Sequence, residues 1–263
     1  MEDIKYFKYR DFGEDTLTKK QHTHNSSFEI LHVLKGNGVI VIDDKLYPLE
    51  DDCIYFIKPM ILHHSAPEKC DDYLRSVVNI SGSYINSFVN ITGFDGHFKK
   101  LCENVCTVLD KSDSKYIDNE FKKLKSNKKS ERSVALMNIL LCLSKAKTEK
   151  FSINNQITDI INYINQNLAE KTTLETISKE FRISKYYLCH IFKETTGMSI
   201  MNYILNQRIS LAKHLMMNTD ASISEVAIAS GFSCFSYFSR IFKEAEGLSP
   251  RAFRKKYKTA DSQ

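Results

Sequence analysis

Apolar positions recur with helical spacing over the last third of the chain, and the same pattern occurs twice. Residues 184–197 and 233–247 both contain Ile-Phe-Lys-Glu, and the matching residues Phe192 and Phe242 are separated by 50 positions. A match at a fixed offset indicates an internal duplication. Each copy predicts a short helix, a tight turn and a second helix.

Start and turn signals are stronger in the second copy. Ser222 and Glu225 have the spacing of a capping box, so we expect a helix to begin there. Gly231 supplies the left-handed backbone of a tight turn, and Ser233 is the expected N-cap of the next helix. Arg182 occupies the equivalent position in the first copy, where it would be strained by roughly 1 kcal/mol unless the turn has another geometry.

The second helix of each copy separates an apolar face from a polar face. We expect the apolar faces in the core; they consist of Leu188, Ile191, Phe192 and Thr195, and of Phe238, Ile241, Phe242 and Ala245. The polar faces carry side chains that can reach base edges and phosphates of DNA: Lys185, Tyr186, Cys189, His190 and Lys193, and Ser236, Tyr237, Arg240 and Lys243. A connecting helix predicted over residues 200–217 would set two such helices about 34 Å apart, in successive major grooves.

The candidate DNA contacts differ in the role that their chemistry favours. Arg240 is the leading base reader, because a guanidinium binds guanine O6 and N7 together. Lys193 and Lys243 come late in their helices, so phosphate or solvent is their expected partner. Cys189 hydrogen-bonds weakly, and a small surface residue is the alternative for it.

Before residue 81 the pattern changes to short runs of β-branched and aromatic residues separated by turn signals. The clearest runs are 28–34, 38–42 and 53–57. Strands joined by tight turns predict a small β-barrel or jelly roll. Helical periodicity returns over 85–109, 116–124 and 134–143, in helices that either pair with a second subunit or cover their own barrel.

The repeated segment resembles a known family. Residues 231–243 and 247–254, with Phe-Lys-Glu followed by Gly-x-Ser in both copies, look like the AraC/XylS family of bacterial transcriptional regulators. The resemblance covers about residues 155–257 and implies a DNA-binding domain of seven helices. Its base-reading positions correspond here to Tyr186, Cys189 and His190, and to Ser236, Tyr237 and Arg240. By family habit the regulator is an activator that contacts RNA polymerase and forms a homodimer.

Histidines and one glutamate in the first domain resemble the metal-binding pattern of cupin barrels. His22, His24, Glu29 and His64 would supply three imidazoles and one carboxylate, a set that suits a divalent transition metal. A metal-dependent cupin enzyme with a regulatory DNA-binding tail is the alternative function. We favour an effector pocket lined by His24, Glu29 and His64, with no metal, cofactor or catalytic residue, and a sugar as a plausible effector.

Composition and charge agree with two domains of different character. From residue 151 onward there are 14 Lys and Arg against 10 Asp and Glu, whereas residues 1–150 hold 23 against 22. The basic excess therefore lies where DNA is expected to bind. No run approaches the 18 or so apolar residues of a membrane span, and seven irregularly spaced cysteines fit free thiols in a reducing cytoplasm.

We therefore expect an α+β multidomain chain in the cytoplasm, away from membranes. Residues 1–82 would form a cupin-like β-barrel effector domain, 83–145 a helical dimerisation or packing region, 146–155 a linker, and 156–258 an all-α domain with two helix-turn-helix units. The expected partners are double-stranded promoter DNA and a small-molecule effector. The resemblance adds RNA polymerase and a second copy of the chain.

Overall fold

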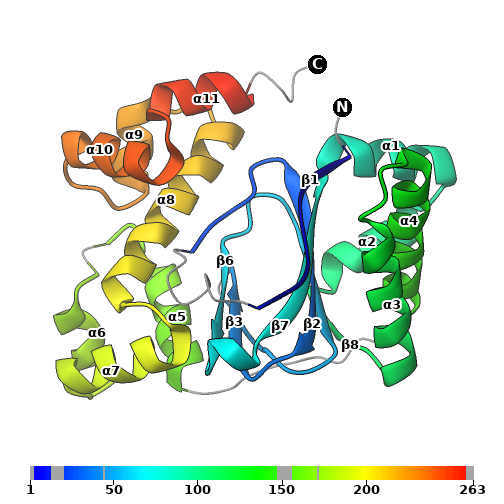
Figure 1. Ribbon diagram of the computed structural model, residues 1–263. Helices are drawn as coiled ribbons and strands as arrows, with labels where there is room; N and C mark the ends of the chain where they lie inside the picture. Colours follow the sequence, from blue (N-terminus) through cyan, green and yellow to red (C-terminus); the bar gives the residue numbers. More distant parts are fainter. Residues whose placement is uncertain (1–2, 13–20, 44, 147–155, 171, 259–263) are drawn as a thin grey trace. The chain divides into compact units, whose positions relative to one another are not determined.

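The protein divides into two compact units, Met1–Ile153 and Asn154–Gln263. A computed structural model describes residues 3–12, 21–43, 45–146, 156–170 and 172–258. The first unit combines strands and helices, and the second is helical throughout its described part (Figure 1). The expected α+β multidomain class is confirmed. The expected linker, residues 146–155, lies outside the described residues except for Ala146.

Two antiparallel sheets form the centre of the first unit. The larger sheet has the order β1 (Ile4–Phe12), β7 (Leu74–Ser81), β2 (Ser27–Lys35), β5 (Cys53–Ile57) and β8 (Cys106–Val108). The smaller sheet has the order β4 (Lys45–Pro48), β3 (Gly38–Ile42) and β6 (His63–Pro67). The two share one hydrophobic core, to which both β2 and β3 contribute. Among the described residues they remain separate sheets, so the expected cupin-like barrel is an open one.

Strand β2 is buried on both faces, and the period of two in its side chains decides what each face contacts. Phe28 and Ile30 belong to the core beneath the helices, whereas Leu31 and Val33 belong to the core between the sheets. Glu29 has the same parity as Leu31. It therefore points between the two sheets, although it is charged.

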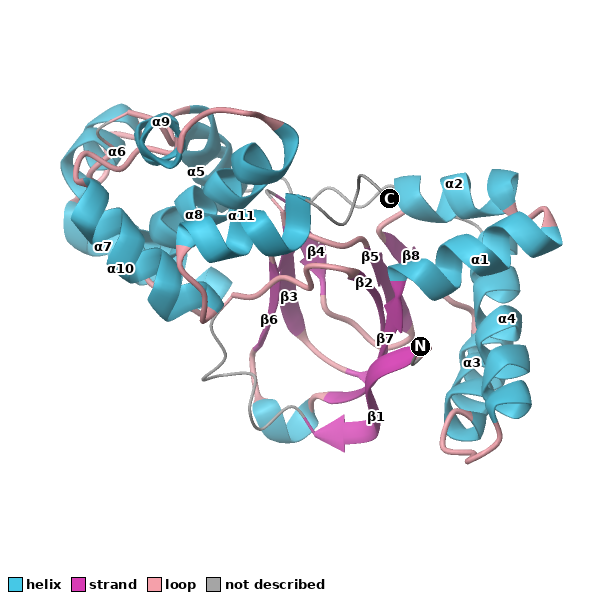
Figure 2. Cartoon of the chain, turned by 90° about the horizontal axis from the view of Figure 1, so that it is seen from above, coloured by secondary structure: helices cyan, strands magenta, loops and turns pink. Residues whose placement is uncertain are grey.

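Four helices cover the outer face of the larger sheet (Figure 2). They are α1 (Gly82–Thr92), α2 (Asp95–Glu103), α3 (Lys111–Lys123) and α4 (Lys129–Lys145). The expectation of helix over all of 85–109 was wrong, because Gly93 ends α1 with a left-handed backbone and residues 106–108 form an edge strand against β5.

Seven helices make up the described part of the second unit: α5 (Gln156–Gln166), α6 (Leu174–Glu180), α7 (Lys185–Thr196), α8 (Ile200–Asn218), α9 (Ile223–Ala229), α10 (Phe235–Glu246) and α11 (Pro250–Lys258). The pairs α6–α7 and α9–α10 are the two predicted helix-turn-helix units, and α8 is the predicted connecting helix. None of the described helices of the whole chain is both long and apolar enough to cross a membrane.

The helix starts follow the sequence signals, with one exception. Ser222 and Glu225 form the predicted capping box, in which the Ser222 N–H donates to Glu225 Oε2 over 2.7 Å. Ser184 caps α7 through the N–H of Tyr187. The expected cap at Ser233 is wrong, because α10 begins one residue later, after Cys234, and has no side-chain cap.

The tight turns of the two helix-turn-helix units use different residues for the same backbone conformation. Gly231 has φ +85° and Arg182 has φ +54°, so the first helix-turn-helix unit does hold the strained left-handed arginine. A Cβ atom at Gly231 would lie 2.2 Å from the Leu168 carbonyl oxygen and 2.7 Å from Arg208 Nε. Glycine is therefore required at position 231 by space as well as by φ.

We predict that Gly231→Ala destabilises the second unit by about 2–4 kcal/mol, the sum of left-handed strain and steric overlap. Gly247→Ala is the matched control, since Gly247 has φ +71° but nothing within 4 Å of its ideal Cβ. It should cost only about 1 kcal/mol. Urea unfolding of the full chain, followed by helical circular dichroism, measures both; equal losses would contradict the proposed crowding.

His32 provides a prediction about pH. Burial lowers its pKa to about 4 from the ordinary 6.5, against the opposing charges of Asp118 and Asp52. As the pH is lowered, the unfolded chain therefore binds this proton at a higher pH than the folded protein does. The contribution of His32 to the free energy of unfolding is fully present above pH 6.5 and decreases as the pH falls toward 4.

Between pH 7 and 5, His32 should remove about 2 kcal/mol from the free energy of unfolding of the first unit. Over the same pH range, the free energy of unfolding of His32→Gln should fall by about 2 kcal/mol less than that of the wild type. The substitution His97→Gln, at an exposed histidine, should leave the pH dependence of the wild type unchanged. Denaturant unfolding at the two pH values provides the comparison. An identical pH dependence in all three proteins would show that His32 does not titrate in this way.

Candidate functional site

The exposed faces of α7 and α10 form the first candidate site. Leu188 and Phe192 anchor α7 in the core, and Phe238 and Phe242 anchor α10, all four with no exposed surface. On the opposite sides, the predicted DNA contacts are exposed except for the half-buried Cys189: Lys185, Tyr186, His190, Lys193, Ser236, Tyr237, Arg240 and Lys243. We call α7 and α10 the reading helices.

The predicted core faces of the reading helices need a correction at their ends. Ile191, Thr195 and Ile241 are half-buried, and Ala245 is exposed. Thr196 is fully buried instead, where its hydroxyl donates to the Phe192 carbonyl oxygen over 2.7 Å. That bond accounts for a polar side chain in the core, which apolar periodicity alone does not predict.

Basic side chains on the reading helices already have acidic partners. Arg240 Nη1 lies 2.8 Å from Glu244 Oε1, one turn further along α10, and its guanidinium lies 5.5 Å from the Tyr237 ring centre. In α7, His190 Nε2 lies 3.6 Å from Glu194 Oε2. The Arg240 and Glu244 side chains are 60% and 57% exposed, so their ion pair contributes little stability and Arg240 can exchange it for another partner.

Helix α8 connects the two helix-turn-helix units and is fixed to both. Its 19 residues span about 28 Å at the normal helical rise. Arg208 donates from α8 to the carbonyl oxygens of Leu168 and Glu170, over 3.0 and 2.8 Å, and its guanidinium also adjoins Gly231. One arginine therefore contacts both the approach to α6 and the turn after α9.

Lys213 provides the second attachment of α8. It is 1% exposed, its Nζ lies 2.9 Å from Glu246 Oε1 at the end of α10, and it lies 5.7 Å from the Phe253 ring centre. Burial lowers the pKa of Lys213, and the charge of Glu246 opposes that change. Neither Arg208 nor Lys213 was predicted from the sequence, because a cation in a helix is expected at the surface.

A cavity of about 550 Å³ in the first unit is the second candidate site. Its lining comes from β1, β2, β6 and β7 and from the segment before β2: Lys5, Tyr6, His22, His24, Ser27, Glu29, Leu31, His63, His64, Ser65, Arg75, Val77 and Asn79. The three predicted effector-pocket residues, His24, Glu29 and His64, all lie in this lining. Arg75, Val77 and Asn79 were missed, although their spacing of two along β7 marks one face of a strand.

Four of these residues form a tight group of side chains, the His22–His24–Glu29–His63 cluster. One ligand atom from each lies within 4.8 Å of the others. The sequence pattern placed His64 in this group, and the structure corrects that position to His63. Successive residues of β6 point to opposite faces, and His63 is the one that the backbone pairs directly with His22, through bonds of 3.0 and 3.1 Å.

Glu29 is the negative charge at the centre of the cluster. Its Oε2 lies 2.7 Å from His24 Nε2, and its Oε1 lies 3.5 Å from His63 Nε2. Burial alone would raise the pKa of Glu29, but the charge of His63 and hydrogen bonds from both histidines outweigh burial and lower it. Burial likewise opposes the effect of Glu29 on His63, whose pKa is raised. Glu29 is consequently an anion in spite of its burial.

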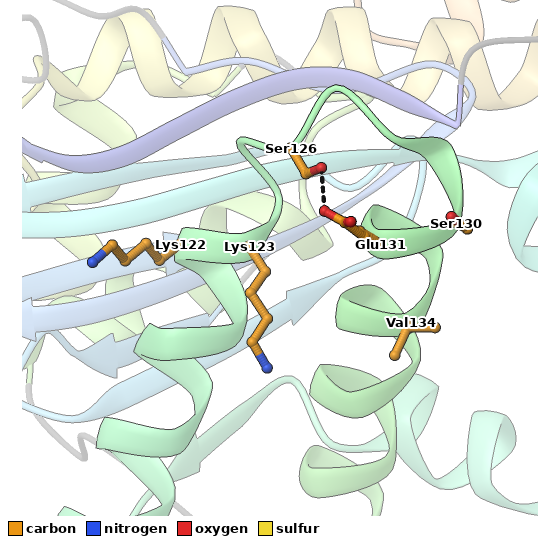
Figure 3. Close-up of a pocket in the computed structure, with 6 residues that line it drawn as sticks. All are labelled: Lys122, Lys123, Ser126, Ser130, Glu131 and Val134. Atoms are coloured by element: carbon orange, nitrogen blue, oxygen red, sulfur yellow. Dashed lines mark hydrogen bonds between the residues drawn. The ribbon is translucent and has the colours of Figure 1, made fainter.

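A second hollow lies between the end of α3 and the start of α4 (Figure 3). It is lined by Lys122, Lys123, Ser126, Ser130, Glu131 and Val134, and Ser126 donates to Glu131 over 2.5 Å. Glu131 and Val134 are both exposed. No buried charged side chain lines this hollow, so its polar groups are solvated and do not hold a ligand in one orientation.

Two family models match the chain. Residues 7–141 match the AraC-like ligand binding domain, and residues 177–256 match a helix-turn-helix domain. The first match contains the cavity and its histidine cluster, and the second contains both reading helices.

Curated proteins match over most of the chain. The uncharacterized HTH-type transcriptional regulator YdiP of Escherichia coli (strain K12) is 26% identical over 90% of this chain and 81% of its own length. The HTH-type transcriptional activator RhaS of Enterobacter sp. (strain 638) is 23% identical over 88% of this chain and 86% of its own.

Among solved structures, ToxT from Vibrio cholerae O395 is similar, with 17% identity, a TM-score of 0.40, and coverage of 90% of this chain and 92% of that one. The family models, read together with the duplicated helix-turn-helix units and the sheet-rich first unit, identify the chain. It belongs to the AraC/XylS family of DNA-binding transcriptional regulators.

Proposed function

We propose that this protein activates transcription by binding promoter DNA through α7 and α10, under the control of a small molecule held in the cavity of the first unit. The observation that carries the proposal is the pair of exposed polar faces joined by the single helix α8. Two reading helices held at a fixed distance suit two successive major grooves on one side of a duplex, about 34 Å apart.

Roles within the reading helices follow from side-chain chemistry and exposure. Arg240, Tyr186, His190, Ser236 and Tyr237 are proposed to reach base edges, and Cys189 contributes only a small contact. Lys185, Lys193 and Lys243 are proposed to contact phosphates, because an ammonium is a point charge with no fixed fork of donors.

The proposed effector binds in the cavity near His24, Glu29 and His64. The lining offers imidazole, carboxylate, amide and hydroxyl groups beside Leu31 and Val77. Such a wall suits a small hydroxyl-rich molecule such as a sugar, through hydrogen bonds to its polar edge and contacts to its apolar face. Control of transcription further requires that the effector bind two arrangements of the protein with unequal affinity.

The remaining assignments complete the proposal. The chain acts by binding, without a catalytic residue, in the cytoplasm where promoter DNA lies, as a homodimer that contacts RNA polymerase. Residues 1–82 serve as the effector domain, 83–145 as a dimerisation or packing region, 146–155 as the linker and 156–258 as the DNA-binding domain.

Two substitutions on α10 test the division between base reading and phosphate contact. Arg240→Ala should relax sequence preference at one base pair, by about 1–3 kcal/mol of discrimination, because a bidentate contact is lost. Lys243→Ala should weaken binding to all sequences alike and lower the slope of log affinity against log salt by about 1. Both residues are exposed, so neither change disturbs the core formed by Phe238 and Phe242.

The measurement is a titration of the full protein with its selected DNA site, with single-base variants of that site, and with unrelated duplex, at several salt concentrations. Each substitution is the control for the other, since they lie one turn apart on the same helix. Equal effects of both on every sequence would refute the assignment of these roles.

A further inference from the structure

The His22–His24–Glu29–His63 cluster is more compact than hydrogen bonding within a pocket wall requires. The ring centres of His22 and His63 are 4.4 Å apart, those of His22 and His24 are 5.1 Å apart, and those of His24 and His63 are 5.4 Å apart. All three imidazoles therefore gather around one carboxylate. That carboxylate forms a close hydrogen bond with only one of the two histidines beside it, His24.

His63 is oriented so that one nitrogen faces the cluster. Its Nδ1 lies 2.9 Å from the Ile61 carbonyl oxygen, which can only accept, so Nδ1 carries the proton and Nε2 carries a lone pair in the neutral ring. The side chain is 3% exposed, and its buried Nε2 faces Glu29 Oε1 over 3.5 Å, with no closer hydrogen-bond partner among the described residues. A backbone carbonyl on the far ring nitrogen is the usual support of a metal-binding histidine.

The backbone also holds the four side chains in place before any ligand arrives. His22 and His63 are paired to each other, and Glu29 lies in the middle of β2, between Asn79 of β7 and Ile57 of β5. Asn79 Nδ2 lies within 3.2 Å of the His24 ring nitrogens and limits the rotation of that ring. A site on paired strands keeps its ligands close to one geometry.

We propose that His22, His24, Glu29 and His63 bind one divalent transition-metal ion inside the cavity. Three imidazole nitrogens and one carboxylate oxygen are the donors that zinc and its neighbours accept, at bonds of about 2.0–2.2 Å. Four such donors lie about 3.4 Å apart around a tetrahedral ion. The ligand atoms of the cluster all lie within 4.8 Å of one another, so each pair exceeds that spacing by at most about 1.4 Å.

This assignment replaces the expectation that these histidines only line the effector pocket. The assignment deepens the proposed function, because it identifies the metal ion as one ligand of the effector pocket. Only the regulatory role of the ion rests on the proposed function. Metal binding is measurable without DNA or effector, so its failure would leave the DNA-binding proposal intact, and the reverse also holds.

Cobalt(II) is the probe for the test, since its visible absorption reports the donor atoms. The full-length protein, treated with chelator and dialysed, is titrated with Co²⁺, and Zn²⁺ is then added to displace it. We expect one ion per chain and a spectrum without the near-ultraviolet thiolate-to-cobalt band. That band would instead indicate binding by some of the seven cysteines.

The matched variants are His63→Gln and His64→Gln. Both histidines are buried neighbours in β6 that line the cavity, but only His63 belongs to the cluster. His63→Gln should weaken Co²⁺ binding roughly tenfold or more, as should Glu29→Gln, whereas His64→Gln should bind like the wild type. Zn²⁺ should raise the thermal unfolding temperature of the wild type and of His64→Gln only.

Circular dichroism establishes that each variant is folded before its titration, and Glu29→Gln replaces His63→Gln if the latter does not fold. The proposal is overturned if the wild type binds no stoichiometric ion, if the thiolate band dominates the spectrum, or if His63→Gln and His64→Gln weaken binding equally.

Discussion

In the proposed mode of DNA binding, sequence reading depends on the fixed separation of α7 and α10, and helix α8 sets that separation. A flexible linker of the same length would let the two helix-turn-helix units move independently, and each would then pay its own entropic cost of ordering on DNA. Arg208 and Lys213 fix the helix at two points instead. Of the two contacts, that of Lys213 carries the larger desolvation cost, since a buried cation is tolerated only beside a partner such as Glu246.

The pocket depends on a simpler constraint, the alternation of side chains along paired strands. Because β2 is buried on both faces, every second residue reaches the space between the sheets, and Glu29 is the charged member of that series. Its carboxylate requires neighbours that offset the loss of water. The histidines supply them, so the same contacts that make the charge tolerable also form the cluster to which we assign a metal ion.

Local signals explain why much of the fold could be predicted from the sequence. The Ser222–Glu225 capping box, Gly231 in the turn after α9, and the helical pattern over residues 200–217 each act within a few turns of helix, so the sequence alone contains the cause. A prediction failed where a contact with a distant part of the chain decides the local structure. Residues 106–108, predicted as helix, form a strand because β5 offers an edge. For Arg182, where two turn geometries were left open, the structure has the left-handed one.

The candidate sites show the same division between local and distant causes. The faces of α7 and α10 follow from helical periodicity, and eight of the nine predicted DNA contacts are exposed. Choosing between His63 and His64 requires the register of β6 against its neighbours, which one strand alone does not reveal. The residues that sequence reasoning missed act through partners that are distant in sequence: Arg75, Asn79, Arg208 and Lys213. Glu246, the partner of Lys213, is 33 positions away, and the partners of the other three are farther still.

We propose above all that two rigidly spaced helices of this protein read DNA together. Its most direct test is to incubate the purified protein with sheared genomic DNA from its source at near-physiological salt and to sequence the retained fragments. We expect the fragments to share a motif of two parts about one helical turn apart. No enriched motif, with or without cell extract to supply an effector, or a motif with a single part, would contradict it.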